Sequence, residues 1–186
     1  RDLRMSRGLG DVYKRQNEFY PVFEDEKGTY ILNAKDLCMI DHIDKLAEAG
    51  VDSFKIEGRA KSSYYVSVIT NAYRMAMDIY KQASDKFELP EWIHDEVFKV
   101  SHRAYCTGFF FGHPKDCQYY ENSGYIRNYD VVAVIDECRN GRIYAQQRNK
   151  FNRGDILEVL APGSKPVKIT AETIFNEKDE EVESAN

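Results

Sequence analysis

Strand-like and helix-like hydrophobic patterns alternate in the first half of the chain. Residues 28–32 form a short apolar stretch, residues 41–50 are expected to form a helix, and residues 53–57 are typical of a short strand. A longer helix is predicted to begin at Ser62 or Ser63. Its apolar face carries Tyr65, Val68, Ile69, Ala72, Ala76 and Ile79. Strand, helix, strand and helix in this order is the rhythm of βα units on a parallel sheet, so this half resembles the end of a larger α/β domain.

The first predicted helix has signals at both of its ends. Asp41 belongs to the residue types that cap helix N-termini, and Gly50 stands where a glycine commonly follows the last helical turn. Ile43, Leu46 and Ala47 mark its apolar face. We therefore expect Asp41 to be the N-cap.

The pattern changes in the second half of the chain. Residues 84–104 are expected to be a linker that includes a short helix, and from Tyr105 the chain has β-like patterning. Asn140-Gly141 is a strong signal for a two-residue hairpin turn. Strands are predicted at residues 129–136, 142–147, 156–160 and 167–175. Short strands with frequent turns favour a small barrel or a sandwich.

Composition narrows the class of protein. The hydrophobic fraction of 42% and the charged fraction of 31% support a packed core and exclude wholesale disorder. No apolar run approaches the roughly 18 residues that cross a bilayer, so we expect no membrane association. The net charge of −5 argues against a globally basic nucleic-acid binder, although it leaves room for a local basic site. Nothing in the sequence suggests secretion, so the cytoplasm is the expected location.

Residues 1–16 are expected to be foreign to the protein. They have no apolar period, and the hexapeptide from Asp11 to Gln16 is what the end of a common sequencing-library transposon adaptor encodes. The alternative is a natural basic arm. On the first interpretation the native chain is truncated: its first part is missing, and it continues upstream of Asn17. The C-terminus is expected to be incomplete too.

Cys38 is the cysteine with the most suggestive context. It lies between a predicted strand and a helix start, where backbone amides lower the pKa of a thiol and suit a metal ligand. Cys106, Cys117 and Cys138 are expected to be reduced thiols without a ligand role, because the spacings match no zinc pattern. A structural role for Cys38 is the alternative.

The segment from Lys55 to Lys61 is the densest cluster of candidate catalytic residues. In a strand, Lys55, Glu57 and Arg59 point to the same side, and charged groups at the end of a barrel strand are typical of catalytic sites. Arg59 and Lys61 are suited to hold an anion, while Glu57 pairs with a cation or acts as a base. A buried structural salt bridge is the alternative.

A second group of basic residues is suited to substrate binding. His102 and Arg103 lie at the junction of the two halves, and Arg148 and Lys150 lie in a hairpin loop. With the nearby tyrosines, these side chains could contact RNA through phosphate pairing and base stacking. A solvated loop face is the alternative.

Taken together, these motifs resemble the collagenase-like peptidases of family U thirty-two. The matching segments, which span roughly residues 18–175 in order, are residues 33–38 (Asn-Ala-Lys-Asp-Leu-Cys), 49–59 (Ala-Gly-Val-Asp-Ser-Phe-Lys-Ile-Glu-Gly-Arg), 101–103 (Ser-His-Arg), 107–110 (Thr-Gly-Phe-Phe) and 147–151 (Gln-Arg-Asn-Lys-Phe). Among members, the chain is most similar to tRNA hydroxylases that form 5-hydroxyuridine at the wobble position.

The resemblance implies a fold of α/β plus β class. Residues 17–83 would be the last βα units of a TIM-like barrel, residues 84–104 a linker, and residues 105–186 an incomplete small β-barrel domain. It also implies a four-iron–four-sulfur cluster in the full-length protein, with Cys38 as one ligand and three ligands upstream.

The resemblance implies an enzyme that acts on tRNA, with prephenate as the oxygen donor and a paralogous partner subunit. The 186-residue chain by itself is expected to be inactive. Two alternatives remain open at this stage. One is a peptidase, as the family is named, and the other is a non-catalytic RNA-binding module.

Overall fold

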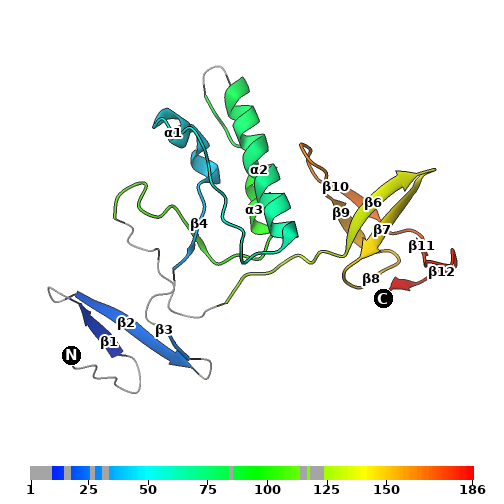
Figure 1. Cartoon of the computed structure of the whole chain (residues 1–186), viewed down its shortest axis with the longest axis horizontal. Helices are drawn as coiled ribbons and strands as arrows, with labels where there is room; N and C mark the ends of the chain where they lie inside the picture. The colour runs from blue at the N-terminus through cyan, green and yellow to red at the C-terminus, as the bar shows by residue number, and fades with distance from the viewer. Residues whose placement is uncertain are drawn as a thin grey trace. The chain divides into compact units, whose positions relative to one another are not determined.

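Figure 1 shows the computed structural model of the chain. The structure describes residues 10–14, 18–25, 28–30, 34–83, 86–113, 117 and 124–186. The chain divides into two compact units, which are described separately. The first contains residues 1–39 and 101–126, and the second contains residues 40–100 and 127–186. The domain boundaries expected from the sequence stay a prediction.

The first unit contains two small sheets. Strands β1 (Gly10–Lys14), β2 (Glu18–Asp25) and β3 (Gly28–Tyr30) form an antiparallel sheet in the order β1-β2-β3. Strand β4 (Asp36–Leu37) pairs in parallel with β5 (Tyr105–Cys106), although the two strands are far apart in the sequence. This parallel pair positions the residues of the candidate site.

The helices of the second unit begin with a single tight turn. The 3₁₀ turn η1 (Ile40–His42) leads into α1 (Ile43–Glu48), and the cap position of α1 is His42, without a capping side-chain bond. The prediction that Asp41 is the N-cap is therefore wrong, because helical winding starts one residue earlier, at the buried Ile40. Gly50 has φ = 81° and ends the helix as expected.

Helix α2 (Ser63–Gln82) follows the expected pattern and packs on α3 (Glu91–Phe98). The Ser62 hydroxyl accepts a hydrogen bond from the Tyr65 backbone N–H at 3.2 Å, which caps α2. Val68, Ile69, Ala72 and Ala76 of the predicted apolar face are buried, while Tyr65 and Ile79 at its ends are half-buried, and α2 packs on α3. The core comprises Ile40, Ile43, Val68, Ile69, Ala72, Ala76, Ile93, Val97 and Val100. Each buried Val or Ile contributes on the order of 1.5–3 kcal/mol to folding.

The strand predicted at residues 53–57 is absent. Residues 51–58 belong to no helix or strand, although their exposure alternates as in a strand. Phe54 and Ile56 are half-buried while Lys55 and Glu57 are exposed. A strand requires a hydrogen-bonded neighbour, and in the part of the chain that the structure describes no strand pairs with this segment.

The β-rich part of the second unit is built from hairpins and short strands. Strands β6 (Ala133–Arg139) and β7 (Arg142–Gln147) are antiparallel. The connecting Asn140 and Gly141 have φ = 50° and φ = 73°, which confirms the predicted turn. The remaining strands are β8 (Phe151–Asn152), β9 (Ile156–Val159), β10 (Val167–Thr170), β11 (Ile174–Phe175), β12 (Glu181–Val182) and β13 (Ser184–Ala185). They pair as β9 with β10, β11 with β12 and β8 with β13.

The described residues form one three-stranded sheet and five two-stranded sheets. The TIM-like barrel and the small β-barrel expected from the sequence stay predictions. No helix in the described ranges is long and apolar enough to cross a membrane.

Candidate functional site

Cys38 lies between a strand end and a helical turn, as the sequence predicts. Its backbone N–H donates to the Cys106 carbonyl at 2.9 Å, and the Asp36 N–H donates to the Ala104 carbonyl at 2.9 Å. The Cys38 side chain is half-buried. The segment that carries Cys38 is therefore held by the segment at residues 104–106.

Arg103 strengthens this junction through its backbone and its side chain. The Arg103 backbone N–H donates to Asp36 Oδ2 at 3.0 Å, and its Nη1 donates to the Ala34 carbonyl at 3.2 Å. The guanidinium carbon lies 5.3 Å from the centroid of the Tyr125 ring. The structure thus brings two predicted site residues, Cys38 and Arg103, into one local assembly.

His102 is buried beneath the same junction. Only 1% of the residue is exposed, and its ring stacks on Tyr105 at 4.3 Å. Nδ1 lies 2.6 Å from the Arg103 carbonyl oxygen, so Nδ1 carries the proton and donates. This burial favours a positioning role for His102 beside Arg103, and its predicted contact with substrate stays a prediction.

Cys106 lies beside Cys38, whose backbone N–H bonds to the Cys106 carbonyl, and the Cys117 side chain is hydrogen-bonded to Cys106; sequence reasoning missed this proximity. Burial raises the pKa of the Cys106 thiol, and the hydrogen-bonded Cys117 side chain raises it further. The Lys35 backbone N–H donates to the Cys117 carbonyl at 3.0 Å. Because β4 and β5 belong to different halves of the sequence, no local spacing signals this gathering of cysteines. Among the residues that the structure describes, no group of three or more His, Cys, Asp or Glu is arranged to hold a metal ion.

The residues predicted to be catalytic, Lys55, Glu57 and Arg59, lie in the second unit, and all three are exposed. These three side chains form no buried salt bridge among the described residues, and their catalytic role stays a prediction. Glu57 Oε1 accepts the Arg59 backbone N–H at 2.8 Å, which orders the turn after the extended segment. A Cβ added at Gly58 would lie 2.6 Å from Val66 Cγ2, so this position needs glycine.

Lys61 closes the same turn. Its backbone N–H donates to the Gly58 carbonyl at 3.0 Å, and its ammonium lies 5.1 Å from the centroid of the Tyr65 ring. The turn thus presents cationic side chains next to a carboxylate, which is an arrangement that can bind an anionic substrate.

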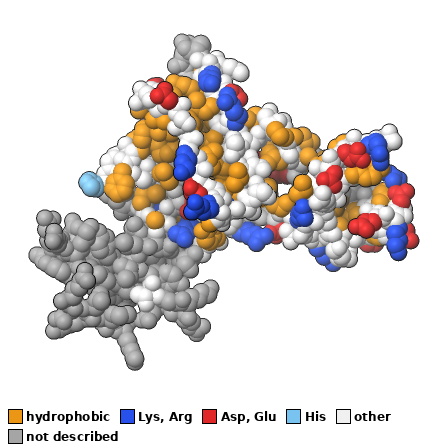
Figure 2. All heavy atoms as spheres, viewed as in Figure 1, with side chains coloured by type: hydrophobic (Ala, Val, Ile, Leu, Met, Phe, Trp, Pro, Cys, Tyr) orange, Lys and Arg blue, Asp and Glu red, His pale blue; other side chains and the backbone are white. Residues whose placement is uncertain are grey.

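Arg148 and Lys150 are exposed at the end of the β6–β7 hairpin. The Arg148 backbone N–H donates to the Val132 carbonyl at 2.8 Å, and its Nη2 donates to Gln146 Oε1 at 3.0 Å. On the face drawn in Figure 2, Lys and Arg side chains are interspersed with Asp and Glu over these strands. Substrate binding by Arg148 and Lys150 stays a prediction.

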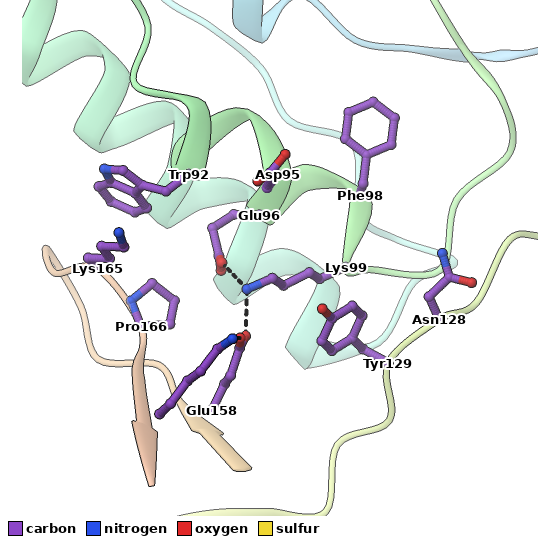
Figure 3. Close-up of a pocket in the computed structure, with 11 residues that line it drawn as sticks. Trp92, Asp95, Glu96, Phe98, Lys99, Asn128, Tyr129, Glu158, Lys165 and Pro166 are labelled. Carbon is purple, nitrogen blue, oxygen red and sulfur yellow. Dashed lines mark hydrogen bonds and ion pairs between the residues drawn. The ribbon is translucent and has the colours of Figure 1, made fainter. Parts of the chain in front are cut away.

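Sequence reasoning also missed a partly buried ion cluster. Lys99 Nζ lies 2.6 Å from Glu96 Oε1 and 2.5 Å from Glu158 Oε2 (Figure 3). Burial alone lowers the pKa of Lys99, but the hydrogen bonds to Glu158 and Glu96 outweigh it and hold this pKa above its ordinary value. The cluster joins α3 to β9. Because Lys99 and Glu158 are 59 residues apart, no short motif signals it.

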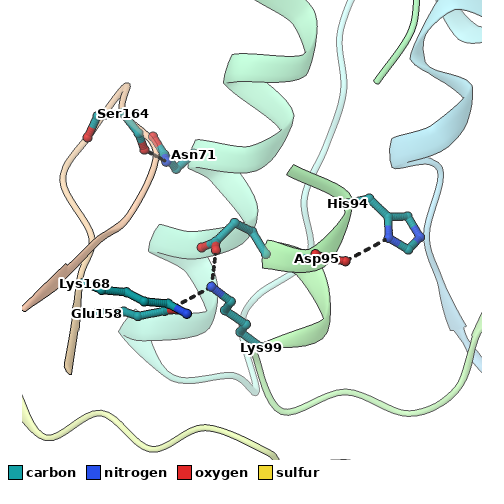
Figure 4. A network of polar contacts seen from close by, with 8 residues as sticks. Asn71, His94, Asp95, Lys99, Glu158, Ser164 and Lys168 are labelled. Carbon is teal, nitrogen blue, oxygen red and sulfur yellow. Dashed lines mark hydrogen bonds and ion pairs between the residues drawn. The ribbon is translucent and has the colours of Figure 1, made fainter. Parts of the chain in front are cut away.

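A second contact joins the same two regions. The Gly163 backbone N–H donates to Asn71 Oδ1 at 2.7 Å, and Asn71 Nδ2 donates to the Ser164 carbonyl at 3.5 Å. Figure 4 shows Asn71 of α2 against Ser164, and Lys99 against Glu158. These polar contacts fix the β9–β10 loop against the helices.

Comparisons with known proteins agree along most of the chain. Residues 6–119 match peptidase family U32, and residues 127–186 match the peptidase family U32 C-terminal domain. The first match begins within residues 1–16, and the adaptor origin of that segment stays a prediction. No solved structure gives a significant match.

Three curated relatives illustrate the range of names in this group. "tRNA hydroxylation protein P1" from Bacillus subtilis is 34% identical over 169 residues, which are 88% of this chain and 40% of that protein. "tRNA hydroxylation protein P2" from the same organism is 41% identical over 101 residues, 53% of this chain and 33% of that protein. "Collagenase" from Porphyromonas gingivalis is 34% identical over 89 residues, 47% of this chain and 24% of that protein.

This chain spans about 40% of the length of the first of these relatives. The two family matches together take in the Cys38 junction, the segment from Lys55 to Lys61 and the β hairpins. The chain belongs to peptidase family U32.

Proposed function

We propose that the protein containing this chain is an enzyme that hydroxylates tRNA and forms 5-hydroxyuridine at the wobble position. The observation that carries the proposal is the 34% identity to "tRNA hydroxylation protein P1" across 88% of this chain. That similarity extends over both units, so it includes the Cys38 junction as well as the β-rich part.

A four-iron–four-sulfur cluster is the proposed cofactor, with Cys38 as one ligand. Thiolates are the usual ligands of such clusters, and the half-buried Cys38 thiol on a backbone held at Cys106 is suited to that role. The remaining ligands would come from outside the described residues. When bound, the cluster would supply one-electron redox chemistry.

Lys55, Arg59 and Lys61 are the proposed anchors for an anionic co-substrate, and prephenate is proposed as the oxygen donor. The first two cations are exposed and flank Glu57, which holds the turn at Arg59. Charge-assisted hydrogen bonds from Arg to a carboxylate are stronger than neutral ones, and they fix the orientation of the ligand.

The proposed macromolecular substrate is tRNA. The cytoplasm is the proposed location, because the substrate is found there. A paralogous partner subunit is proposed as well. Its support is that one organism has two related proteins, named P1 and P2, which both match this chain.

A peptidase is the second candidate, favoured by the 34% identity to "Collagenase" over 89 residues. A candidate thiol–histidine pair for such a peptidase is Cys106 with His102, which lies four residues before it. Burial raises the pKa of that thiol, whereas a cysteine nucleophile needs a lowered pKa. The hydroxylase is therefore better supported.

The test uses a bacterial strain without its own tRNA hydroxylation genes. Expression of the full-length protein should restore a uridine derivative that is one oxygen atom heavier in tRNA digests analysed by mass spectrometry. Arg59→Ala should abolish that product, while Lys178→Ala, a change at an exposed lysine of the tail, should not. Cleavage of gelatin without any change in tRNA would favour the peptidase.

A further inference from the structure

A pocket in the second unit contains none of the predicted catalytic, metal-binding or basic substrate-binding residues. We propose that it binds one unstacked nucleotide of a single-stranded RNA segment, with the base inside and the adjoining phosphate on Lys165 and Lys168. This inference rests on the proposed function, in which tRNA is the substrate of the enzyme. It adds a site that binds an unpaired nucleotide of that tRNA.

The pocket has the size and the aromatic walls that a base requires. Its volume is about 370 Å³, within the usual range for small-molecule sites. Trp92 comes from α3 and Tyr129 from the segment before β6, and both line it. In Figure 3 these two side chains lie on opposite sides of the ion pair between Lys99 and Glu158. Aromatic rings that line a concave site are the common platforms for unpaired bases.

The charges inside the pocket favour a neutral base over a phosphate. Lys99 is 15% exposed and lies between the carboxylates of Glu96, 7% exposed, and Glu158, 23% exposed. Glu158 Oε1 also lies 3.9 Å from the Lys168 ammonium, so these ammonium groups and carboxylates offset one another, and the interior has no surplus of positive charge to draw a phosphate inward. A base carries no charge, and its N–H groups can donate to carboxylate oxygens such as those of Glu158.

The rim of the pocket carries exposed ammonium groups. The Lys168 side chain is 74% exposed, and Lys165 is exposed with its ammonium 5.9 Å from the centroid of the Trp92 ring. Lysines beside an aromatic wall form the usual combination of single-strand sites, in which the phosphate pairs with the cations and the base stacks. The cationic rim of the pocket therefore suits the phosphate, and its aromatic interior suits the base.

A single strand is the form of RNA that fits. In a duplex the bases are stacked and their edges are paired, so they cannot enter a concave site without being extruded. Loops of tRNA present unpaired nucleotides at no such cost.

Trp92 makes the inference directly measurable, because it is the only tryptophan of the chain. The 186-residue chain is titrated with a uridine heptamer while its tryptophan fluorescence is recorded. We expect saturable quenching as a base stacks near Trp92. Fluorescence anisotropy of a labelled heptamer gives the same affinity independently, and it keeps the assay usable for Trp92→Phe.

Variants separate the two parts of the site. Tyr129→Ala should weaken binding roughly 5- to 150-fold, the range for loss of one stacked base. Lys165→Ala with Lys168→Ala removes the contact to one phosphate and should reduce the magnitude of the slope of log affinity against log salt by roughly 0.7. Lys178→Ala is the matched control, since Lys178 does not line the pocket, and it should change neither quantity. Thermal melts by circular dichroism verify that each variant is folded.

Several outcomes would overturn the inference. These are quenching that is equal for duplex and single-stranded RNA, affinity unchanged in both the Tyr129 and the lysine variants, or quenching by a gelatin peptide but not by RNA. Hydroxylation of tRNA that persists without heptamer binding would refute the pocket alone. Heptamer binding without any tRNA hydroxylation by the full-length protein would refute the proposed function alone.

Discussion

Replacing Lys99 with methionine removes the ammonium group that lies between two carboxylates. Lys99 Nζ is 2.6 Å from Glu96 and 2.5 Å from Glu158, and the Glu96 side chain is only 7% exposed. Breaking a buried ion pair by removing one partner costs about 3–5 kcal/mol, because the remaining charge stays buried. Glu158 is 23% exposed and keeps part of its solvation, so we expect Lys99→Met to lower the free energy of unfolding by roughly 2–4 kcal/mol.

Urea denaturation at pH 7, followed by Trp92 fluorescence, measures this loss close to the cluster. Two variants serve as controls. Lys99→Arg keeps the positive charge and should retain most of the stability. Lys99→Met combined with Glu96→Gln and Glu158→Gln should recover part of the loss, because it leaves no buried charge unpaired. A loss below about 1 kcal/mol in Lys99→Met would refute the reasoning, since that is the range of an exposed ion pair.

The same cluster predicts a pH dependence with a definite sign. The pKa of folded Lys99 lies above its ordinary value of 10.5. The folded state therefore binds the proton more tightly than the unfolded chain does, and the contribution of Lys99 is fully present below pH 10.5. It declines as the pH rises above that value toward the pKa of the folded state. The stability difference between the wild type and Lys99→Met should accordingly narrow above pH 10.5, and a difference that grows there would contradict the assignment.

Three further predictions concern the candidate site and its supports. At pH 8, iodoacetamide should modify the exposed Cys138 faster than Cys106, whose pKa burial raises, and mass spectrometry of the peptides should show the order. Gly58→Ala should lower stability in thermal melts by roughly 1–3 kcal/mol through its contact with Val66, and Val66→Ala should restore part of the loss. In the anaerobically purified full-length protein, Cys38→Ser should lower iron and sulfide content while Cys138→Ser leaves both unchanged. Equal iron content in the wild type, Cys38→Ser and Cys138→Ser would exclude Cys38 as a ligand.

Features with local causes were predictable from the sequence. The start of α2 follows from the hydroxyl of Ser62 and the helical spacing of its apolar face, which depend on neighbouring residues only. The turn at Asn140 and Gly141 follows from the ability of these two residues to adopt positive φ.

Features with distant causes were not predictable. The strand expected at residues 53–57 has the alternating exposure of a strand but no pairing partner among the described strands, and the sequence of one segment cannot specify a partner. The contact between Lys99 and Glu158 spans 59 residues, so it depends on how β9 packs against α3. The pocket beside this contact follows from the same packing, and residue spacing gives no sign of it.

The parallel pairing of β4 with β5 determines how the result of the Cys38→Ser experiment is interpreted. The Cys38 backbone is fixed by its N–H bond to the Cys106 carbonyl, and the Asp36 carboxylate accepts the Arg103 N–H. None of these bonds involves the Cys38 thiol. Serine at position 38 keeps these backbone contacts and replaces the sulfur with oxygen, so a loss of iron in Cys38→Ser with an unchanged thermal melt would report on ligation. Asp36→Ala tests the effect of position alone. It removes the carboxylate that accepts the Arg103 N–H, so it should displace the Cys38 thiol and lower the iron content although the cysteine is still present.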